Sequence, residues 1–380
     1  MKIKNVLTSL TLCLAMASCI QDEALNVEAA IDGCSGNDIQ QYLIDPNEYT
    51  VQLYVSRAAD LSKININFDL PFGASIAPAQ KTPEDGANIY NFKNENPRQF
   101  KVTSEDGAFS STYTIRIWQT EMPVTYDFEK LSSDNPYHKF TEDNPSVGSI
   151  IRRLELASGN PGFELTKMAK SPEDYPTVQV NGGVDGGKCV KLETKDTGSF
   201  GTMVNMFIAA GNLFVGSFEV GQALNNAMKA TRFGFPYFYY PLKLEGWYKY
   251  QAGPYFSSQG KIIEGKKDKC DIYGVLYETD ENVQFLDGSN SLTSPNIVAL
   301  ARDIDMLPET KNWRPFSFNF VPQNGKSIDS QKLAKGVYKL AIVFSSSVDG
   351  AKFEGAVGST LYVDKVVLKQ TSDPNEYPLQ

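Results

Sequence analysis

Two segments near the end of the chain, Val337–Phe344 (VYKLAIVF) and Thr360–Leu368 (TLYVDKVVL), decide the fold class. The apolar residues of the first segment are nearly continuous, which is typical of a strand that is buried on both faces or lies in the middle of a sandwich. The second segment is β-branched and apolar apart from Asp364 and Lys365, and Asp364 is its one acid, which needs a partner because burying an unpaired carboxylate is costly. The intervening Val348–Ser359 is glycine-rich, so the sequence predicts two strands joined by a loop.

Composition favours an all-β protein. The 380 residues are enough for two domains with separate cores. Aromatic residues make up 12% of the chain, with 19 Tyr and 22 Phe against a single His, which favours β packing over histidine-dependent chemistry. The formal net charge is -9 and the sequence has no basic cluster, so we exclude nucleic acid as a partner.

The N-terminus is predicted to be a targeting segment. Lys2 and Lys4 precede the apolar run Val6–Ala17, which is too short to span a bilayer, and we assign 1–18 as a signal peptide. Met16–Cys19 resembles the lipobox of bacterial lipoproteins, which implies cleavage before Cys19 and lipid modification of that residue. The alternative is an ordinary secretory signal followed by a chance cysteine.

The acidic residues of Ile20–Glu23 follow directly. They resemble the export signal that sends lipoproteins of Gram-negative polysaccharide degraders to the outside of the outer membrane, although a solvated linker would also be acidic. The resemblance implies a protein that is lipid-anchored in the outer membrane and faces the cell exterior. Residues 19–38 have little apolar periodicity, and we expect a tether there.

Three cysteines remain after Cys13 and Cys19 are set aside. Because Cys34, Cys189 and Cys270 cannot all pair, a disulfide framework does not organise the fold. A bridge between Cys189 and Cys270 and buried thiols are both left open. No cysteine spacing matches a zinc site.

The first domain is expected at 39–121. Apolar residues alternate at Val51–Val55 and Ile64–Phe68, and Glu105–Gly107 is a hairpin signal, so this region contains several short strands. The stretch 102–118 (VTSEDGAFSSTYTIRIW) resembles the last hairpin of bacterial immunoglobulin-like modules, which implies a small β-sandwich. We expect it to be a spacer, with ligand binding by its loops as the alternative.

The second domain is expected at 122–370, followed by a tail at 371–380. The glycine-rich 181–187 lacks the Lys-Ser/Thr ending of a phosphate loop, and we predict a tight turn. A short helix is predicted only within 221–231. The number of strands and the long loops fit a jelly roll whose two packed sheets give one concave face. Before the closing pair, strands are expected at 188–194, 213–218, 242–251, 271–278, 296–302 and 316–321.

Five segments of this domain carry a family resemblance. They are LFVGSFEV (213–220), FPYFYYPLKLEGWYKYQAG (235–253), CDIYGVLYET (270–279), NIVALA (296–301) and the closing YKLAIVFSSSVDGAKFEGAVGSTLYVDKVVL (338–368). In this order they resemble the putative carbohydrate metabolism domain of surface lipoproteins from gut polysaccharide degraders. The resemblance implies a jelly roll similar to carbohydrate-binding modules after an immunoglobulin-like domain. The family resemblance implies no catalytic residues for this chain.

Candidate carbohydrate contacts are aromatic rings that stack on sugars and acids that accept from sugar hydroxyls. Alternation along 242–251 puts Leu242, Leu244 and Tyr248 on the core face, and it puts Trp247 among charged groups on the other face. Trp247 is either a binding platform or covered by a loop, and Trp313 is either a second platform or a loop anchor. The candidate residues are Trp247, Trp313, Tyr250, Glu245 and Asp271.

A calcium site is implied by resemblance. In many carbohydrate-binding jelly rolls a structural calcium lies between a Phe-Glu pair on the first strand and a Val-Asp pair on the last, and Phe128-Glu129 and Val363-Asp364 look similar. Glu129 and Asp364, with loop carbonyls, would supply hard oxygen ligands. The alternative is a salt bridge with Lys365 or another cation.

Glycoside hydrolysis needs two facing carboxyl groups roughly 5 to 9.5 Å apart. Acids on strands or adjoining loops are Asp271, Glu278, Asp287, Glu245 and Glu354, but solvated surface positions explain nearly all of them. His138 has no Ser or Cys signature nearby, so a catalytic triad has little support. We therefore assign no catalytic residue.

The leading hypothesis is a cell-surface lipoprotein that binds glycan or polysaccharide through its second domain, in glycan capture or uptake by a surface complex. The membrane would be reached through the lipid anchor alone. The alternatives are a glycoside hydrolase or other carbohydrate-active enzyme, and a structural or adhesive component of a surface complex.

Overall fold

The computed structural model describes residues 25–223 and 226–377, which form two compact units. Unit 1 comprises the described residues up to Leu53 together with Asp60–Ile117, and unit 2 comprises Tyr54–Ala59 and the chain from Trp118 onward. The predicted signal peptide, the lipidation site Cys19 and the export signal at Ile20–Glu23 lie outside the described residues. No helix of the described ranges combines the length and apolarity that crossing a membrane requires.

Unit 1 consists of short strands. Its main sheet has the order β6-β8-β9-β3-β2, and two ladders pair β1 with β5 and β4 with β7. The predicted alternation is confirmed in β3, where Val51, Leu53 and Val55 are fully buried, and the predicted hairpin joins β8 to β9. The strands are β1 (Gly33–Ser35), β2 (Ile39–Asp45), β3 (Thr50–Ser56), β4 (Ile64–Asn65), β5 (Asn67–Asp69), β6 (Ser75–Pro78), β7 (Ile89–Tyr90), β8 (Arg98–Thr103) and β9 (Ser110–Thr120).

A strand and buried residues lie inside the predicted tether. β1 pairs with β5, and Ile31 and Cys34 are buried. The prediction of a tether as far as residue 38 is therefore wrong for 31–35. A three-residue strand is too short to show a period of two in the sequence, which is why it was missed.

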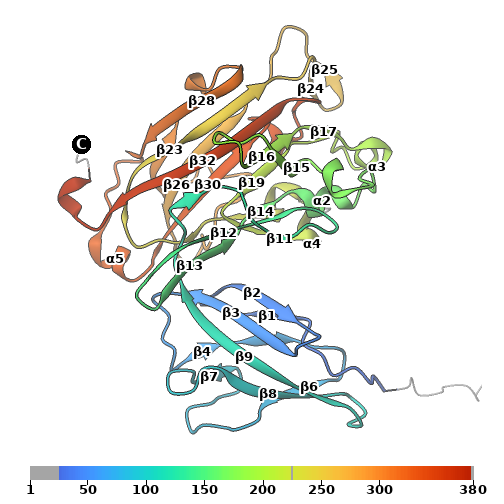
Figure 1. Cartoon of the computed structure of the whole chain (residues 1–380), viewed down its shortest axis with the longest axis vertical. Helices are drawn as coiled ribbons and strands as arrows, with labels where there is room; N and C mark the ends of the chain where they lie inside the picture. The colour runs from blue at the N-terminus through green and yellow to red at the C-terminus, as the bar shows by residue number, and fades with distance from the viewer. Residues whose placement is uncertain (1–24, 224–225, 378–380) are drawn as a thin grey trace, which may run out of the picture. The chain divides into compact units, whose positions relative to one another are not determined.

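Unit 2 contains two antiparallel sheets with a large apolar core, to which both contribute (Figure 1). We call them the β32 sheet and the β30 sheet after their central strands. The all-β prediction is confirmed. The β32 sheet contains β15 (Thr177–Asn181), β16 (Lys188–Glu193), β32 (Thr360–Thr371), β23 (Tyr240–Gln251) and β28 (Thr310–Asn319), with β10 (Thr125–Tyr126) also paired to β32. The β30 sheet contains β14 (Ala157–Ser158), β19 (Asn212–Phe214), β30 (Tyr338–Ser345), β26 (Asp271–Glu278), β27 (Ile297–Arg302) and β29 (Val321–Pro322), with β22 (Phe235–Pro236) also paired to β30.

Short ladders surround these sheets. The meander β11-β12-β13 leads from β10 toward β14, and the other ladders lie in the long connections. Their strands are β11 (Leu131–Ser133), β12 (Lys139–Val147), β13 (Ile150–Glu155), β17 (Lys195–Asp196), β18 (Ile208–Ala209), β20 (Gly216–Phe218), β21 (Thr231–Phe233), β24 (Phe256–Ser258), β25 (Lys261–Ile262) and β31 (Gly355–Ala356).

The continuous apolar run of β30 is buried on both faces, as predicted. Leu340, Ile342 and Phe344 enter the core between the sheets. Ala341 and Val343 point the other way into a second apolar cluster, which also contains Phe214, Tyr273 and Tyr277. The outer face of the β30 sheet is therefore partly covered by other segments of the chain.

The alternation of core-facing residues along β32 shifts at a β-bulge. Leu361 and Val363 face the core, and after a register shift Val366 and Leu368 face it instead. Lys365, at the shift, has a positive φ of 49°. Asp364 lies next to this bulge and is fully buried, so its carboxylate needs the partners described below.

Helical segments are short and more numerous than predicted. The predicted helix region 221–231 contains α4 and the 3₁₀ turn η2, but several others were missed because five or six residues show no 3.6-residue period. The segments are α2 (Asn160–Glu164), α3 (Gly198–Met203), α4 (Val220–Ala223), α5 (Ser330–Ala334), η1 (Pro172–Asp174), η2 (Ala227–Ala230), η3 (Ile304–Met306), η4 (Gly350–Lys352) and η5 (Pro374–Glu376).

Cys34, Cys189 and Cys270 are all buried and none forms a disulfide. Burial raises the pKa of Cys34 to about 12 and that of Cys189 to about 11. These thiols therefore stay protonated and serve as core side chains. The sequence left two alternatives open, a bridge between Cys189 and Cys270 or buried thiols, and the structure has buried thiols.

Candidate functional site

A cavity of about 390 Å³ lies on the outer face of the β30 sheet. Its floor comes from four neighbouring strands, β19, β30, β26 and β27. Antiparallel register sets Ser345 opposite both Asn212 and Asp271, so one polar row crosses three strands. A second, mainly apolar row lies beside it, and its residues are two positions away from the polar ones on the same strands. The floor residues are Asn212, Phe214, Asp271, Tyr273, Arg302, Val343 and Ser345.

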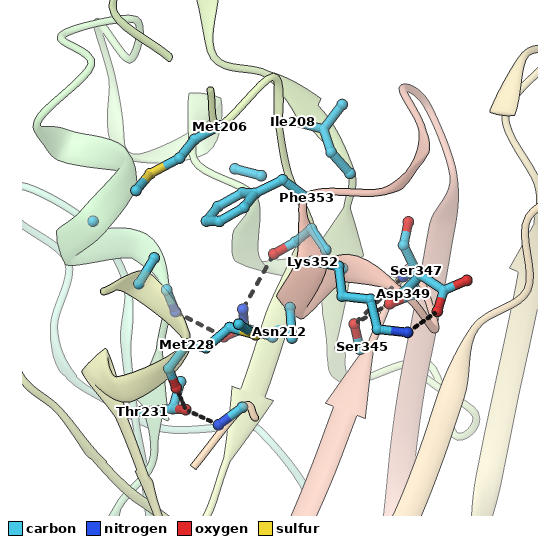
Figure 2. Close-up of a pocket in the computed structure, with 18 of the residues that line it drawn as sticks. Met206, Ile208, Asn212, Met228, Thr231, Ser345, Ser347, Asp349, Lys352 and Phe353 are labelled. Carbon is cyan, nitrogen blue, oxygen red and sulfur yellow. Dashed lines mark hydrogen bonds and ion pairs between the residues drawn. The ribbon is translucent and has the colours of Figure 1, made fainter. Parts of the chain in front are cut away.

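The walls come from the long connections rather than from the sandwich. α2, α3, η2 and η4 all contribute residues, and Figure 1 shows α2, α3 and α4 on the same side of unit 2. Figure 2 shows the side chains that these segments direct at the cavity. Its volume falls in the range of roughly 300–1,000 Å³ that is common for small-molecule sites.

The floor holds a buried ion pair between Asp271 and Arg302. The guanidinium binds both carboxylate oxygens, with Nε–Oδ1 and Nη2–Oδ2 each 2.9 Å. The Asp271 side chain is 4% exposed and that of Arg302 is 22% exposed. Burial raises the pKa of Asp271, and Arg302 opposes that shift. Among the described residues Nη1 of Arg302 has no hydrogen bond, so its donors are available to a ligand.

A second ion pair lies close to the first. Asp349 accepts from Lys352 at 3.2 Å and from Lys266 at 3.3 Å. Burial acts to raise the pKa of Asp349, but the two lysines lower it overall. Asp349 also acts electrostatically on Asp271 and Arg302. We call Asp271, Arg302, Asp349 and Lys352 the charged corner.

Phe353 follows η4 with a left-handed backbone, φ 59° and ψ 33°. This conformation is unfavourable for a bulky residue, and it costs on the order of 1–3 kcal/mol. Strained backbone of this kind clusters at functional sites. Figure 2 shows the ring of Phe353 among the cavity residues.

A buried hydrogen-bond network fixes the loop that carries Asp349, Lys352 and Phe353. Oδ2 of Asp268 accepts from Ser347 Oγ at 2.6 Å, from Ala356 N at 2.8 Å and from Ser359 Oγ at 2.7 Å. Asp268 is 3% exposed. Because Ser347 and Ala356 bracket the loop, one carboxylate holds both of its ends.

The chain matches a family model described as "Putative carbohydrate metabolism domain" over residues 127–369. The chain belongs to this family. The predicted resemblance to this family is therefore confirmed. No curated protein sequence matches the chain.

Solved structures similar to the chain include two from Bacteroides species. One, described as a putative glycoside hydrolase from Bacteroides thetaiotaomicron, has 41% identity and a TM-score of 0.74, covering 93% of this chain and 100% of that chain. The other, a putative glycoside hydrolase from Bacteroides vulgatus, has 41% identity and a TM-score of 0.61, covering 66% of this chain and 99% of that chain.

Of the five residues predicted to contact carbohydrate, Asp271 lines the cavity. The prediction that Tyr250 contacts carbohydrate is wrong, because Tyr250 is 2% exposed and belongs to the core between the sheets. Its position on the predicted core face already indicated this. Trp247 and Glu245 lie on the outer face of the β32 sheet, where Glu245 accepts from Ser317 at 3.1 Å.

Trp313 is held by several contacts near Lys249 of the β32 sheet. Its ring centroid is 4.4 Å from Lys249 Nζ, which also lies 4.5 Å from the Tyr362 ring. Its Nε1 donates to the carbonyl of Gly182 at 3.2 Å. Both the anchor and the platform interpretations of Trp313 are compatible with these contacts. The β32 sheet therefore offers an alternative candidate binding surface, formed by Trp247, Trp313 and Glu245.

Glu129 and Asp364 approach the same turn. Asp364 Oδ2 accepts from Val184 N at 2.7 Å and Glu129 accepts from Lys188 N at 3.0 Å, so both carboxylates bond to the glycine-rich 182–188. The turn predicted there is present, with Gly182 and Gly183 N–H groups donating to Gly187. In the described ranges no three His, Cys, Asp or Glu side chains gather as metal ligands. Loop carbonyls would have to complete any calcium shell.

The remaining acids and the histidine have structural partners. His138 Nδ1 accepts from Gln179 N at 2.8 Å, and burial lowers the pKa of His138. Glu278 pairs with Lys332, Glu354 accepts from Ser258, and Asp287 accepts from Ser289 in a turn. None of these side chains lines the cavity.

Sequence reasoning missed Arg302, Asp349, Lys352 and Phe353. Arg302 ends a predicted strand, and its pairing with Asp271 follows from register, which a single sequence does not give. The other three lie in the glycine-rich loop before β32. A signal that could have found them is the concentration of charge and aromatic character, DGAKFEG, within a loop of small residues.

Proposed function

We propose that the cavity on the β30 sheet binds carbohydrate and that the protein acts in glycan capture. The charged corner carries this proposal: a nearly buried Asp–Arg pair offers acceptors and directed donors beside phenyl rings. Carbohydrate sites combine these groups, because hydroxyls need hydrogen bonds and sugar C–H faces stack on aromatic rings. The family described for residues 127–369 supports the same class of ligand.

Binding without hydrolysis fits the charged corner better than catalysis does. A glycosidase needs one carboxyl group to donate a proton and a second carboxylate to act as nucleophile or base. Here Asp271 is held at both oxygens by Arg302, and Asp349 is held by two lysines. Neither carboxyl group is left unpaired for that work.

Glycoside hydrolysis is the second candidate. It is favoured by the two carboxyl groups that line the cavity and by the descriptions of the two similar solved structures. Its test is release of reducing sugar from a panel of polysaccharides. Activity in the wild type that is lost in both Asp271→Asn and Asp349→Asn would establish hydrolysis in place of simple binding.

The proposed cellular setting is the outer membrane, facing the exterior, with a lipid at Cys19 as the anchor and a surface glycan-uptake complex as partner. The lipobox resemblance of Met16–Cys19 and the acidic Ile20–Glu23 support it.

A glycan array tests the proposed function. Wild-type protein is compared with Phe353→Gly, which removes the ring at a position where glycine fits the left-handed backbone. Gln259→Gly is the matched control, because Gln259 also has a positive φ, 50°, and is exposed outside the cavity. Binding that is weakened only in Phe353→Gly supports the cavity. Loss in Trp247→Ala instead moves the site to the β32 sheet, and no binding to any glycan contradicts the proposal.

A further inference from the structure

Three polar side chains of the cavity wall and floor are hydrogen-bonded to the protein backbone. Thr231 Oγ1 donates to Met228 O at 3.2 Å, and Ser345 Oγ donates to Ser347 O at 2.8 Å (Figure 2). Asn212 uses both amide atoms, accepting from Gly159 N at 2.8 Å and donating to Ala210 O at 3.2 Å. Thr231 and Ser345 have committed their only hydroxyl hydrogen, and Asn212 has committed one of its two amide hydrogens, so these three side chains offer a ligand few donors.

Most of the other lining side chains outside the charged corner are apolar. Phenyl rings and thioethers from four separate segments face the cavity: Phe200, Met206, Phe218, Met228 and Phe353. Met206 and Met228 add side chains that adapt to the shape of a guest, because thioethers are flexible and polarisable. The cavity therefore has two parts, an apolar chamber and the charged corner.

An unsubstituted pyranose does not match this division. It carries hydroxyl groups around its ring, and each one that is buried against a phenyl or thioether group loses its hydrogen bonds to water without replacement. An acyl or aryl group has no such loss. A sugar ring at the charged corner keeps its hydroxyls near Arg302, Asp349 and Lys352.

We infer that the ligand is a sugar bearing an apolar acyl or aryl substituent, with the substituent in the chamber lined by Met206, Met228 and Phe353 and the sugar at the charged corner. This inference rests on the proposed function and adds the substrate class. The charges of Asp271 and Asp349 are balanced by those of Arg302 and Lys352, and Lys266 beside Asp349 adds one positive charge, so the corner has no excess of negative charge.

Calorimetric titration with synthetic glycosides tests the inference. The probes are methyl, butyl and 4-nitrophenyl glycosides of glucose, galactose, mannose and xylose, with butanol and 4-nitrophenol as sugar-free controls. For one sugar, Kd falls from methyl to butyl by roughly fourfold for each methylene group that is buried. In Phe353→Gly, Kd depends less on the length of the substituent. In Gln259→Gly, which also puts glycine at a left-handed position, Kd depends on substituent length as in the wild type.

The outcomes separate the two proposals. A Kd that is the same for all substituents of one sugar overturns this inference and leaves carbohydrate binding intact. Butanol and 4-nitrophenol binding as tightly as their glycosides contradicts the proposed function, because the sugar then adds nothing. Absence of binding for every probe counts against both, provided that circular dichroism shows a folded protein.

Discussion

Glu142 is the residue whose ionisation is most directly linked to stability. Burial raises its pKa to about 8 from an ordinary value of 4.5, although its carboxylate accepts from Phe128 N at 2.9 Å and from Asp127 N at 3.3 Å. The side chain is on β12 and is 3% exposed. The folded protein therefore holds a proton that the unfolded chain releases above pH 4.5.

From this we predict that stability falls as pH rises from about 5 to about 8, by about 1.4 kcal/mol per pH unit at most for this group. The contribution of Glu142 to stability is largest where it is protonated in both states, below the unfolded pKa. Glu142→Gln keeps an oxygen for the Phe128 amide and removes the titration. Urea unfolding at pH 5 and pH 8 measures the difference, and an equal loss of stability in wild type and variant would refute the assignment.

Asp268 acts at the scale of an element, because it holds the loop between Ser347 and Ala356. We predict that Asp268→Asn weakens ligand binding and destabilises the protein by about 1–3 kcal/mol. The amide oxygen lacks the charge of the carboxylate, and the NH2 group would face the Lys269 N–H that donates to Oδ1. Hydrogen exchange should speed up in 346–359 and stay unchanged in β28. The matched control is Asp303→Asn, because among the described residues the Asp303 carboxylate accepts from Asp305 N alone, in the exposed η3 turn. Unchanged exchange in the loop would exclude the positioning role.

We predict that a calcium ion between Glu129 and Asp364 joins β32 to the 182–188 turn. Added calcium should raise the melting temperature and a chelator should lower it, because the ion would bind the folded state alone. The double variant Glu129→Gln, Asp364→Asn should show neither shift. If chelation leaves the wild-type melting temperature unchanged, the carboxylates bond to the turn without an ion.

Elements with a clear period could be predicted from sequence, and irregular ones could not. Alternation placed Leu244 and Tyr248 in the core and Trp247 on the opposite face, as the structure has them. The short helices and β1 have no measurable period. The cavity depends on long connections such as η4 and on cross-strand register, so the sequence supplied Asp271 but not its partner Arg302.

At the scale of the whole molecule, the proposed lipid anchor makes a prediction that does not depend on the cavity. Cys19→Ala should move the protein from the outer-membrane fraction to soluble material, because the thiol that carries the lipid is gone. Cys34→Ala is the control, since that thiol is buried in unit 1. Fractionation followed by immunoblotting checks the result, and membrane retention of Cys19→Ala would rule out this anchor.

The central claim is that unit 2 binds carbohydrate on the outer face of the β30 sheet. A crystal structure of the protein with the best ligand from the glycan array tests it most directly. The account predicts sugar density beside the charged corner and Phe353. Density against Trp247 and Trp313 on the β32 sheet, with an empty cavity, would contradict it.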